Sequence, residues 1–164
     1  MRKPRIVKVG AAYHITGKIN RSEHIFEPNA VKNLFLDTVK RAKNKYKFKL
    51  YNFCVMENHI HMVVKPGKKE KLSNIMRWIF SVFAIYYNKA NGLKGHVWQD
   101  RFHSVLIEEK QHMIAAFSYV RDNPLKAGMV NDTSSYPFGG VFYILKKDFS
   151  IIDPPLAYLR PFVY

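Results

Sequence analysis

The sequence lacks the features that mark secreted and membrane proteins. Its 164 residues contain a single cysteine, Cys54, so no disulfide can form within the chain. No apolar run approaches the ~20 residues that a membrane-spanning helix needs, and no apolar segment follows the basic start as it would in a signal peptide. Repeats and low-complexity segments are absent as well. We therefore expect one soluble, cytoplasmic domain over residues 1–164.

Acidic residues are also scarce. The chain has 12 Asp and Glu against 27 Lys and Arg, which gives a net charge of +15. Such an excess attracts polyanions, and nucleic acid is the expected partner. Charge alone leaves two other interpretations open, a structural RNA-binding protein and a basic surface that meets only water.

Hydrophobic periodicity predicts an alternation of strands and helices. Strands are expected at residues 11–19, 48–56, 59–65 and 105–107, and helices at 28–45, 73–90 and 110–122. The β-α-β-β-α-β order predicts an α+β, ferredoxin-like antiparallel sheet with helices on one face, followed by a C-terminal helix. Asn123-Pro124 is expected to break or bend that helix, and the chain beyond residue 131 to form extended packing segments. The basic flank of the first helix is expected to face phosphates or water; it consists of Lys32, Lys40, Arg41, Lys43 and Lys45.

Two histidines lie two positions apart in an apolar run. In a strand, His59 and His61 share one face, while Ile60 and Met62 share the other. Parallel imidazoles that are neutral near pH 7 are natural ligands for a divalent metal. The alternative, weighted about equally, is a pair of satisfied or solvent-facing histidines. His14, on the predicted first strand, is interpreted as a structural or groove residue and not as a ligand.

A tyrosine on the predicted last helix adds a candidate nucleophile. Tyr119 lies beside the buried stripe of that helix, and Asn123 follows one turn later. The amide oxygen of Asn123 would be a third ligand for a metal held by His59 and His61. Such a metal polarises a phosphoryl oxygen, and a tyrosine hydroxyl beside it can attack phosphorus. The alternative is a tyrosine that only fills the core or the surface.

Taken together, three stretches resemble the single-tyrosine HUH transposases and, within them, the REP-associated tyrosine transposases. The stretches are MENHIHM at 56–62, GHVWQDRF at 95–102 and YVRDNPLKAGMV at 119–130. Asn-Pro after the tyrosine, where insertion-sequence members place Gln, favours the REP-associated branch. The resemblance spans about residues 5–135 and leaves 136–164 as a C-terminal extension without a counterpart.

This resemblance implies an HUH endonuclease core and a role for each motif residue. His59 and His61 would be the metal pair, with Asn123 as the third ligand of Mg²⁺ or Mn²⁺. Tyr119 would form a 5′-phosphotyrosine bond with single-stranded DNA and release a 3′-hydroxyl during transposition. The expected substrate is hairpin-containing DNA, and the expected assembly is a monomer or a homodimer.

Basic and aromatic side chains elsewhere are predicted to hold the DNA. Contacts to the DNA backbone are expected from Arg5, Lys8, Lys68, Lys69 and Arg101. Trp98 is predicted to stack an unpaired base, for about 1–3 kcal/mol if it is exposed. Phe102 either does the same or packs in the core.

Other assignments fit the sequence less well. A histidine-triad hydrolase would need a histidine at Val63, and a two-tyrosine replication initiator would need a tyrosine at Ala115 or Asn123. The neighbouring pair Tyr86-Tyr87 is interpreted mainly as packing. Two alternatives stay open: a catalytically inactive descendant that binds DNA hairpins, and a basic RNA-binding module of the same fold.

Overall fold

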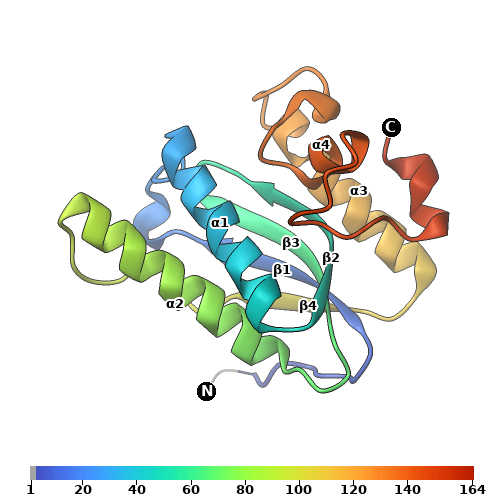
Figure 1. The fold of residues 1–164 in the computed structure, drawn as a ribbon, viewed down its shortest axis with the longest axis horizontal. Coiled ribbons are helices and arrows are strands. Elements are labelled where there is room, and N and C mark those ends of the chain that lie inside the picture. Colours follow the sequence, from blue (N-terminus) through green and yellow to red (C-terminus); the bar gives the residue numbers. More distant parts are fainter. Residues whose placement is uncertain (1–2) are drawn as a thin grey trace.

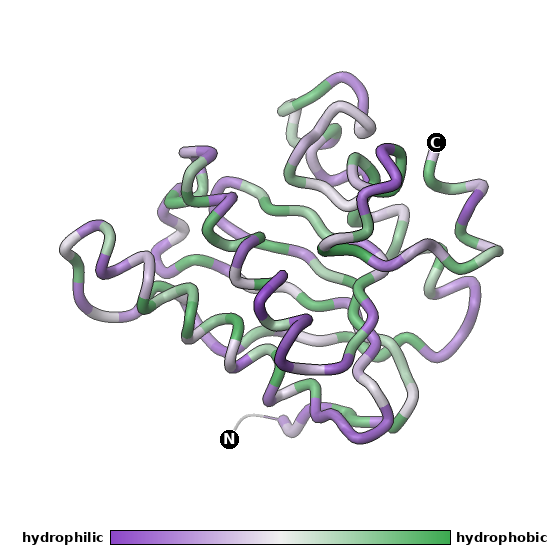
Figure 2. The backbone as a smooth tube through the Cα atoms, in the orientation of Figure 1, coloured by the Kyte–Doolittle hydropathy of each residue, from purple (hydrophilic) through white to green (hydrophobic). Residues whose placement is uncertain are grey.

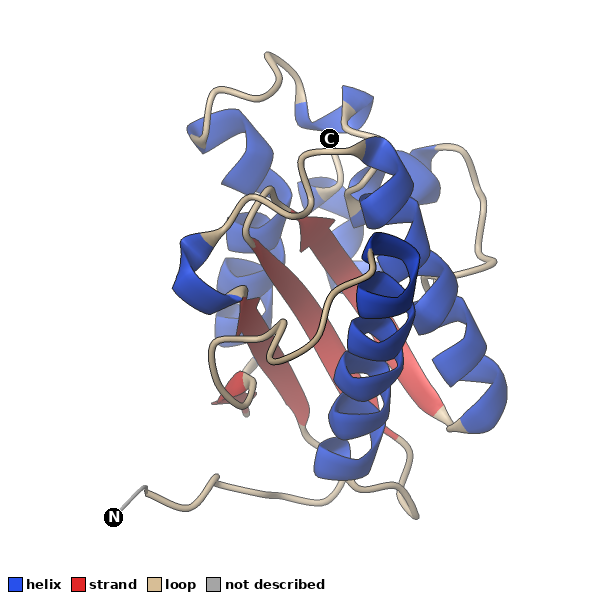
Figure 3. Ribbon diagram, turned by 90° about the vertical axis from the view of Figure 1, so that its left-hand side faces the viewer, coloured by secondary structure: helices blue, strands red, loops and turns tan. Residues whose placement is uncertain are grey.

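The chain folds into an antiparallel sheet with helices on both faces (Figure 1, Figure 3). The computed structural model describes residues 3–164, so Met1 and Arg2 of the basic N-terminus lie outside the described residues. The main elements are β1 (Ala12–Lys18), α1 (Asn29–Lys45), β2 (Phe48–Val55), β3 (His59–Pro66), α2 (Leu72–Asn91), β4 (His103–Ile107), α3 (Lys110–Lys126) and α4 (Gly140–Leu145). No helix within residues 3–164 is long and apolar enough to cross a membrane.

The strands are ordered β2-β3-β1-β4, and each neighbouring pair is antiparallel. Helix α1 connects β1 to β2 and α2 connects β3 to β4, each crossing over a strand that lies between them. The predicted α+β, ferredoxin-like antiparallel sheet is therefore confirmed. In the register of β1 on β3, Thr16 lies opposite His61 and Lys18 lies opposite His59.

The main core lies between the sheet and the helices α1 and α2. Figure 2 shows hydrophobic residues along the central strands and on the helices that cover them. The rings of Phe26, Phe35 and Phe83 pack together there, and Trp98 closes the cluster. A side chain at Gly17 of β1 would overlap the Phe80 ring, so glycine at this position lets α2 approach the sheet closely.

Helix α3 packs against β2 and β3 on the opposite face of the sheet. Its apolar residues Phe117 and Val120 are fully buried. The buried Asn52 of β2 donates its amide hydrogen to the carbonyl of Phe117 at 2.9 Å and accepts from the main-chain N–H of Phe53 at 2.9 Å. This side chain fixes α3 on the sheet, and with it the face that carries Tyr119.

Of the break or bend predicted at Asn123-Pro124, the break does not occur, because α3 continues to Lys126. The fixed φ of proline is itself helical, so only one main-chain hydrogen bond is lost. Pro124 is buried, and the main-chain N–H of Ala127 still donates to the carbonyl of Asn123 at 3.0 Å. The continued helix places Lys126 Nζ 5.7 Å from the centroid of the Tyr119 ring.

The C-terminal extension is more ordered than the prediction of extended segments, since it contains α4. Its residues Phe138 and Gly139 lie along the free edge of β2, where Val55 N–H donates to the carbonyl of Phe138 at 2.9 Å. Asp153 then pairs with Lys43 of α1 and accepts from the N–H of Leu50 at 2.9 Å.

Lys40, Arg41 and Lys45 of the predicted basic flank of α1 are exposed as expected, but two other lysines of that flank are not. Lys43 is engaged by Asp153, and Lys32 is buried with its ammonium 3.1 Å from the carbonyl of Glu27. Neither lysine is presented to a phosphate.

Candidate active site on the sheet

The predicted metal pair lies on the face of the sheet that α3 covers. Ile60 and Met62 of β3 enter the core under α1 and α2, so His59 and His61 point to the other side. His61 is buried and His59 is half-buried. Their ring centroids are 5.0 Å apart, with the ring planes nearly perpendicular at 87°.

The environment of both histidines favours the neutral imidazole. Burial is the main reason that the pKa of His61 falls to about 3, and the neighbouring His59 and His14 add to the effect. Burial also lowers the pKa of His59, and the amide oxygen of Asn123, which favours the protonated ring, opposes this only in part. Neutral rings keep one nitrogen lone pair each, which is what a metal ligand requires.

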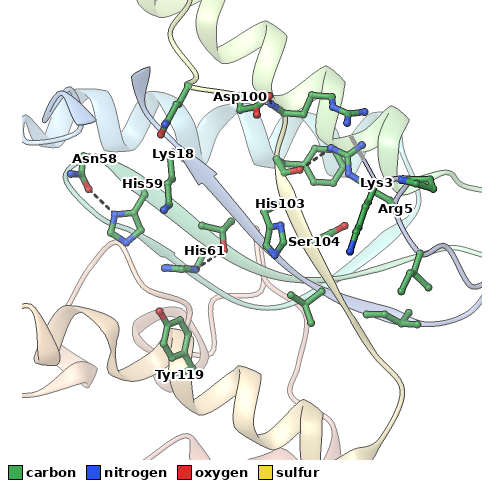
Figure 4. Close-up of a pocket in the computed structure, with 18 of the residues that line it drawn as sticks. Lys3, Arg5, Lys18, Asn58, His59, His61, Asp100, His103, Ser104 and Tyr119 are labelled. Carbon is green, nitrogen blue, oxygen red and sulfur yellow. Dashed lines mark hydrogen bonds between the residues drawn. The ribbon is translucent and has the colours of Figure 1, made fainter. Parts of the chain in front are cut away.

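Tyr119 and Asn123 approach the histidines from α3. The Tyr119 ring lies edge-on to His61, with 5.4 Å between the ring centroids, and Tyr119 is 45% exposed to solvent. One turn further on, Asn123 lies close enough to the imidazole of His59 to raise the pKa of that ring. Figure 4 shows the Tyr119 hydroxyl on the side of the histidines. The structure thus brings together two pairs of residues from distant segments, His59 and His61 of β3 with Tyr119 and Asn123 of α3.

Two imidazole nitrogens and an amide oxygen are a donor set that divalent metals accept in proteins. Asn58 Oδ1 lies 2.7 Å from His59 Nδ1; because an amide oxygen only accepts, the hydrogen of His59 sits on Nδ1 and Nε2 keeps its lone pair. Within residues 3–164, no three His, Cys, Asp or Glu side chains are grouped to hold a metal. The third ligand that the sequence predicts, the amide oxygen of Asn123, belongs to none of these four residue types. The metal itself stays a prediction.

A cleft of about 1270 Å³ opens over the site. His59, His61 and Tyr119 line it at one side, and the N-terminal arm and β4 line it at the other (Figure 4). Most of the charge along this cleft is positive, from Lys3, Arg5, Lys18 and Arg101, against Asp100 and Glu108. Its size and sign suit an extended anionic ligand.

Two of the predicted DNA-binding residues lie in this cleft. Arg101 is exposed there. Arg5 packs its guanidinium 3.6 Å from the centroid of the Phe102 ring and donates to the Phe102 carbonyl at 2.8 Å. Burial and the nearby Arg101 lower the pKa of Arg5, and Asp100 opposes them. Lys8 is exposed beside the cleft and pairs with Glu108 at 3.0 Å.

The other predicted contacts are not gathered with the site. Lys68 and Lys69 are exposed after the end of β3, a strand length of roughly 23 Å from His59. Trp98 stacks on Phe80 at 3.8 Å between centroids and donates to the Phe80 carbonyl at 3.0 Å, on the core side of the sheet. This placement argues against base stacking by Trp98. Phe102 is buried under Arg5, in line with its core interpretation.

Sequence reasoning missed three neighbours of the histidines. Asn58 could have been noticed, because it precedes His59 within the motif. His14 and Thr16 of β1 contact His61 Nδ1 at 3.1 and 3.3 Å. These contacts depend on the pairing of β1 with β3, which no local pattern of the sequence specifies.

Comparison with known proteins identifies the family of this chain. The family model described as "Transposase IS200 like" matches residues 8–123. A Haemophilus influenzae protein named "Putative REP-associated tyrosine transposase" is 22% identical over 126 residues, covering 71% of this chain and 72% of that protein. A solved REP-associated tyrosine transposase bound to a REP hairpin has the same fold, with a TM-score of 0.76 and 20% identity over 96% of this chain and 99% of its own. The predicted resemblance is confirmed, and the chain belongs to the IS200-like transposase family.

Proposed function

We propose that this protein is a metal-dependent endonuclease and strand transferase that acts on single-stranded DNA in transposition. One observation carries the proposal: Tyr119 lines a basic cleft together with His59 and His61, and its ring centroid lies 5.4 Å from that of His61. An exposed tyrosine beside two neutral imidazoles and an amide oxygen is suited to attack on phosphorus.

In the proposed reaction, the hydroxyl oxygen of Tyr119 attacks a phosphodiester phosphorus. The new bond joins Tyr119 to the 5′-phosphate, and the bond from phosphorus to the 3′-oxygen breaks, so a 3′-hydroxyl leaves with a proton. His59, His61 and Asn123 would hold Mg²⁺ or Mn²⁺, which when bound polarises the phosphoryl oxygen. The reverse attack by a 3′-hydroxyl rejoins DNA and frees Tyr119, so no nucleotide cofactor is needed.

Positive charge around the cleft would hold the DNA during both steps. Lys18, Arg101 and the N-terminal Lys3 line the cleft, and Lys126 lies over the face of the Tyr119 ring. Backbone contacts of this kind position a strand without reading its bases. Because the related solved structure holds a REP hairpin, we propose a DNA hairpin as the element that this protein recognises next to the cleavage point.

A covalent adduct tests the proposal most directly. The protein is incubated with Mn²⁺ and a labelled oligonucleotide in which single-stranded DNA flanks a hairpin, then denatured and separated by electrophoresis. We expect label on the wild-type protein and none on Tyr119→Phe, which keeps the ring and removes the hydroxyl. The matched control is Tyr86→Phe, since Tyr86 is also exposed but lies on α2, across the sheet from the histidines.

Two results would contradict the proposal. An adduct that persists in Tyr119→Phe would place the nucleophile elsewhere. A wild-type protein that binds a panel of hairpins tightly and never becomes labelled would instead be a DNA hairpin-binding protein without chemistry.

A further inference from the structure

His14 occupies the space between the two proposed functional groups. Its ring centroid lies 5.2 Å from that of His61 and 5.5 Å from that of Tyr119. It projects from β1, where Thr16 is the residue directly opposite His61, so His14 reaches His61 along the diagonal of the same sheet face. His14 is half-buried there.

The contact between the two histidines joins specific ring nitrogens. His14 Nε2 lies 3.1 Å from His61 Nδ1, and Thr16 Oγ1 lies slightly further away at 3.3 Å. Two neutral imidazoles can share only one hydrogen in such a bond, so one ring donates and the other accepts. If His61 is to offer Nε2 to a metal, its hydrogen must be on Nδ1, and His14 Nε2 must then be the acceptor.

His59 has the same arrangement with a different partner. Its Nδ1 donates to Asn58 Oδ1 at 2.7 Å. In this assignment each histidine of the pair has an acceptor facing Nδ1, supplied by the turn before β3 for His59 and by β1 for His61. A protein partner at Nδ1 is the arrangement that orients metal-binding histidines, whose other ring nitrogen is then the ligand.

We propose that His14 is a positioning residue that holds His61 in the tautomer and ring orientation needed for metal binding, and that packs against Tyr119 so that the nucleophile stays beside the metal. This inference rests on the proposed function and extends it to a residue outside the three motifs. His14 contacts neither DNA nor metal in this role; it acts through His61 and Tyr119.

The test measures metal binding apart from catalysis. Mn²⁺ is titrated into the full-length protein, and free Mn²⁺ is followed by its electron paramagnetic resonance signal. His14→Leu removes the acceptor and should weaken Mn²⁺ binding about 10- to 100-fold. His14→Gln places an amide oxygen near the position of Nε2 and should stay within about threefold of wild type. The control His96→Gln changes an exposed histidine and should have no effect.

A second measurement separates positioning from general damage. With His14→Leu, adduct formation should need about 10- to 100-fold more Mn²⁺ to reach half its maximal rate, and the rate at saturating Mn²⁺ should largely return. Hairpin binding in the presence of a chelator should equal that of wild type, because phosphate contacts supply it.

The possible failures are distinguishable. If His14→Leu binds Mn²⁺ as tightly as wild type, the positioning role is wrong while the proposed function stands. If His14→Leu and His14→Gln lose Mn²⁺ equally and both melt at lower temperature, His14 is only a packing residue and the inference is again wrong. If the wild-type protein binds no Mn²⁺ and forms no adduct, the proposed function fails and this inference fails with it.

Discussion

Asn52 holds α3 on the sheet, so its substitution should lower the stability of the fold much more than substitution of an exposed asparagine. It is completely buried on β2, where it donates to the carbonyl of Phe117 and accepts from the N–H of Phe53, both at 2.9 Å. Asn52→Ala leaves the Phe53 N–H buried without this partner and weakens the attachment of α3. A buried polar group that loses its partner costs about 1–3 kcal/mol, so we expect a loss of about 2–4 kcal/mol for the two contacts together.

Urea unfolding followed by circular dichroism measures this loss. With a slope of about 2 kcal/mol per molar urea for a chain of this size, the midpoint should fall by about 1–2 M. The matched control is Asn91→Ala, because Asn91 also donates from its amide to a main-chain carbonyl, that of Tyr87 at 2.8 Å, but is exposed to solvent. The control should change stability by less than about 0.5 kcal/mol. Equal losses in the two variants would refute the role given to Asn52.

Three further predictions concern the site and the extension. His59→Ala and His61→Ala should each abolish adduct formation. Hairpin affinity, measured by fluorescence anisotropy, should stay within about threefold of wild type, because phosphate contacts supply most of the binding. Adducts formed at the wild-type rate would exclude the metal pair. Arg101→Ala should lower the slope of log affinity against log salt by about 0.7 for single-stranded DNA. Lys68→Ala, which changes a residue outside the cleft, should lower this slope less. Equal slopes for the two variants would mean that the DNA does not follow the cleft. Burial of Asp153 raises its pKa, but hydrogen bonds from two lysines and a main-chain N–H outweigh it and hold the pKa below the usual value. Its contribution to stability is therefore present above pH ~4 and lost as pH falls through the folded-state pKa, so wild type and Asp153→Asn should differ in melting temperature at pH 7 and converge at lower pH; a constant difference would contradict this.

Local rules predicted the parts of the site that lie within one element. Alternation along a strand put His59 and His61 on one face, and the helical repeat put Asn123 one turn from Tyr119. Both are properties of neighbouring residues, so periodicity was sufficient to predict them. The order of the elements predicted the antiparallel sheet for the same reason.

The features that the sequence did not predict depend on contacts between distant segments of the chain. His14 meets His61 only through the register of β1 on β3, and Trp98 is covered by Phe80 of α2, which the pattern of its own loop does not specify. Pro124 stays helical because it is buried in the last turn, so tertiary packing outweighed the general preference of proline. A positive charge count likewise could not show that Lys43 is engaged by Asp153.

The two ends of the chain are unequal sites for attaching another protein. Residues 3–6 line the cleft, whereas Tyr164 is exposed on the side of the C-terminal helices, away from the N-terminal arm (Figure 1). A fluorescent protein or an affinity tag fused after Tyr164 would leave the cleft open. The same fusion at the N-terminus would be tethered at its rim and compete with the incoming strand for space, so the choice of terminus decides whether a labelled form of this protein still accepts its substrate.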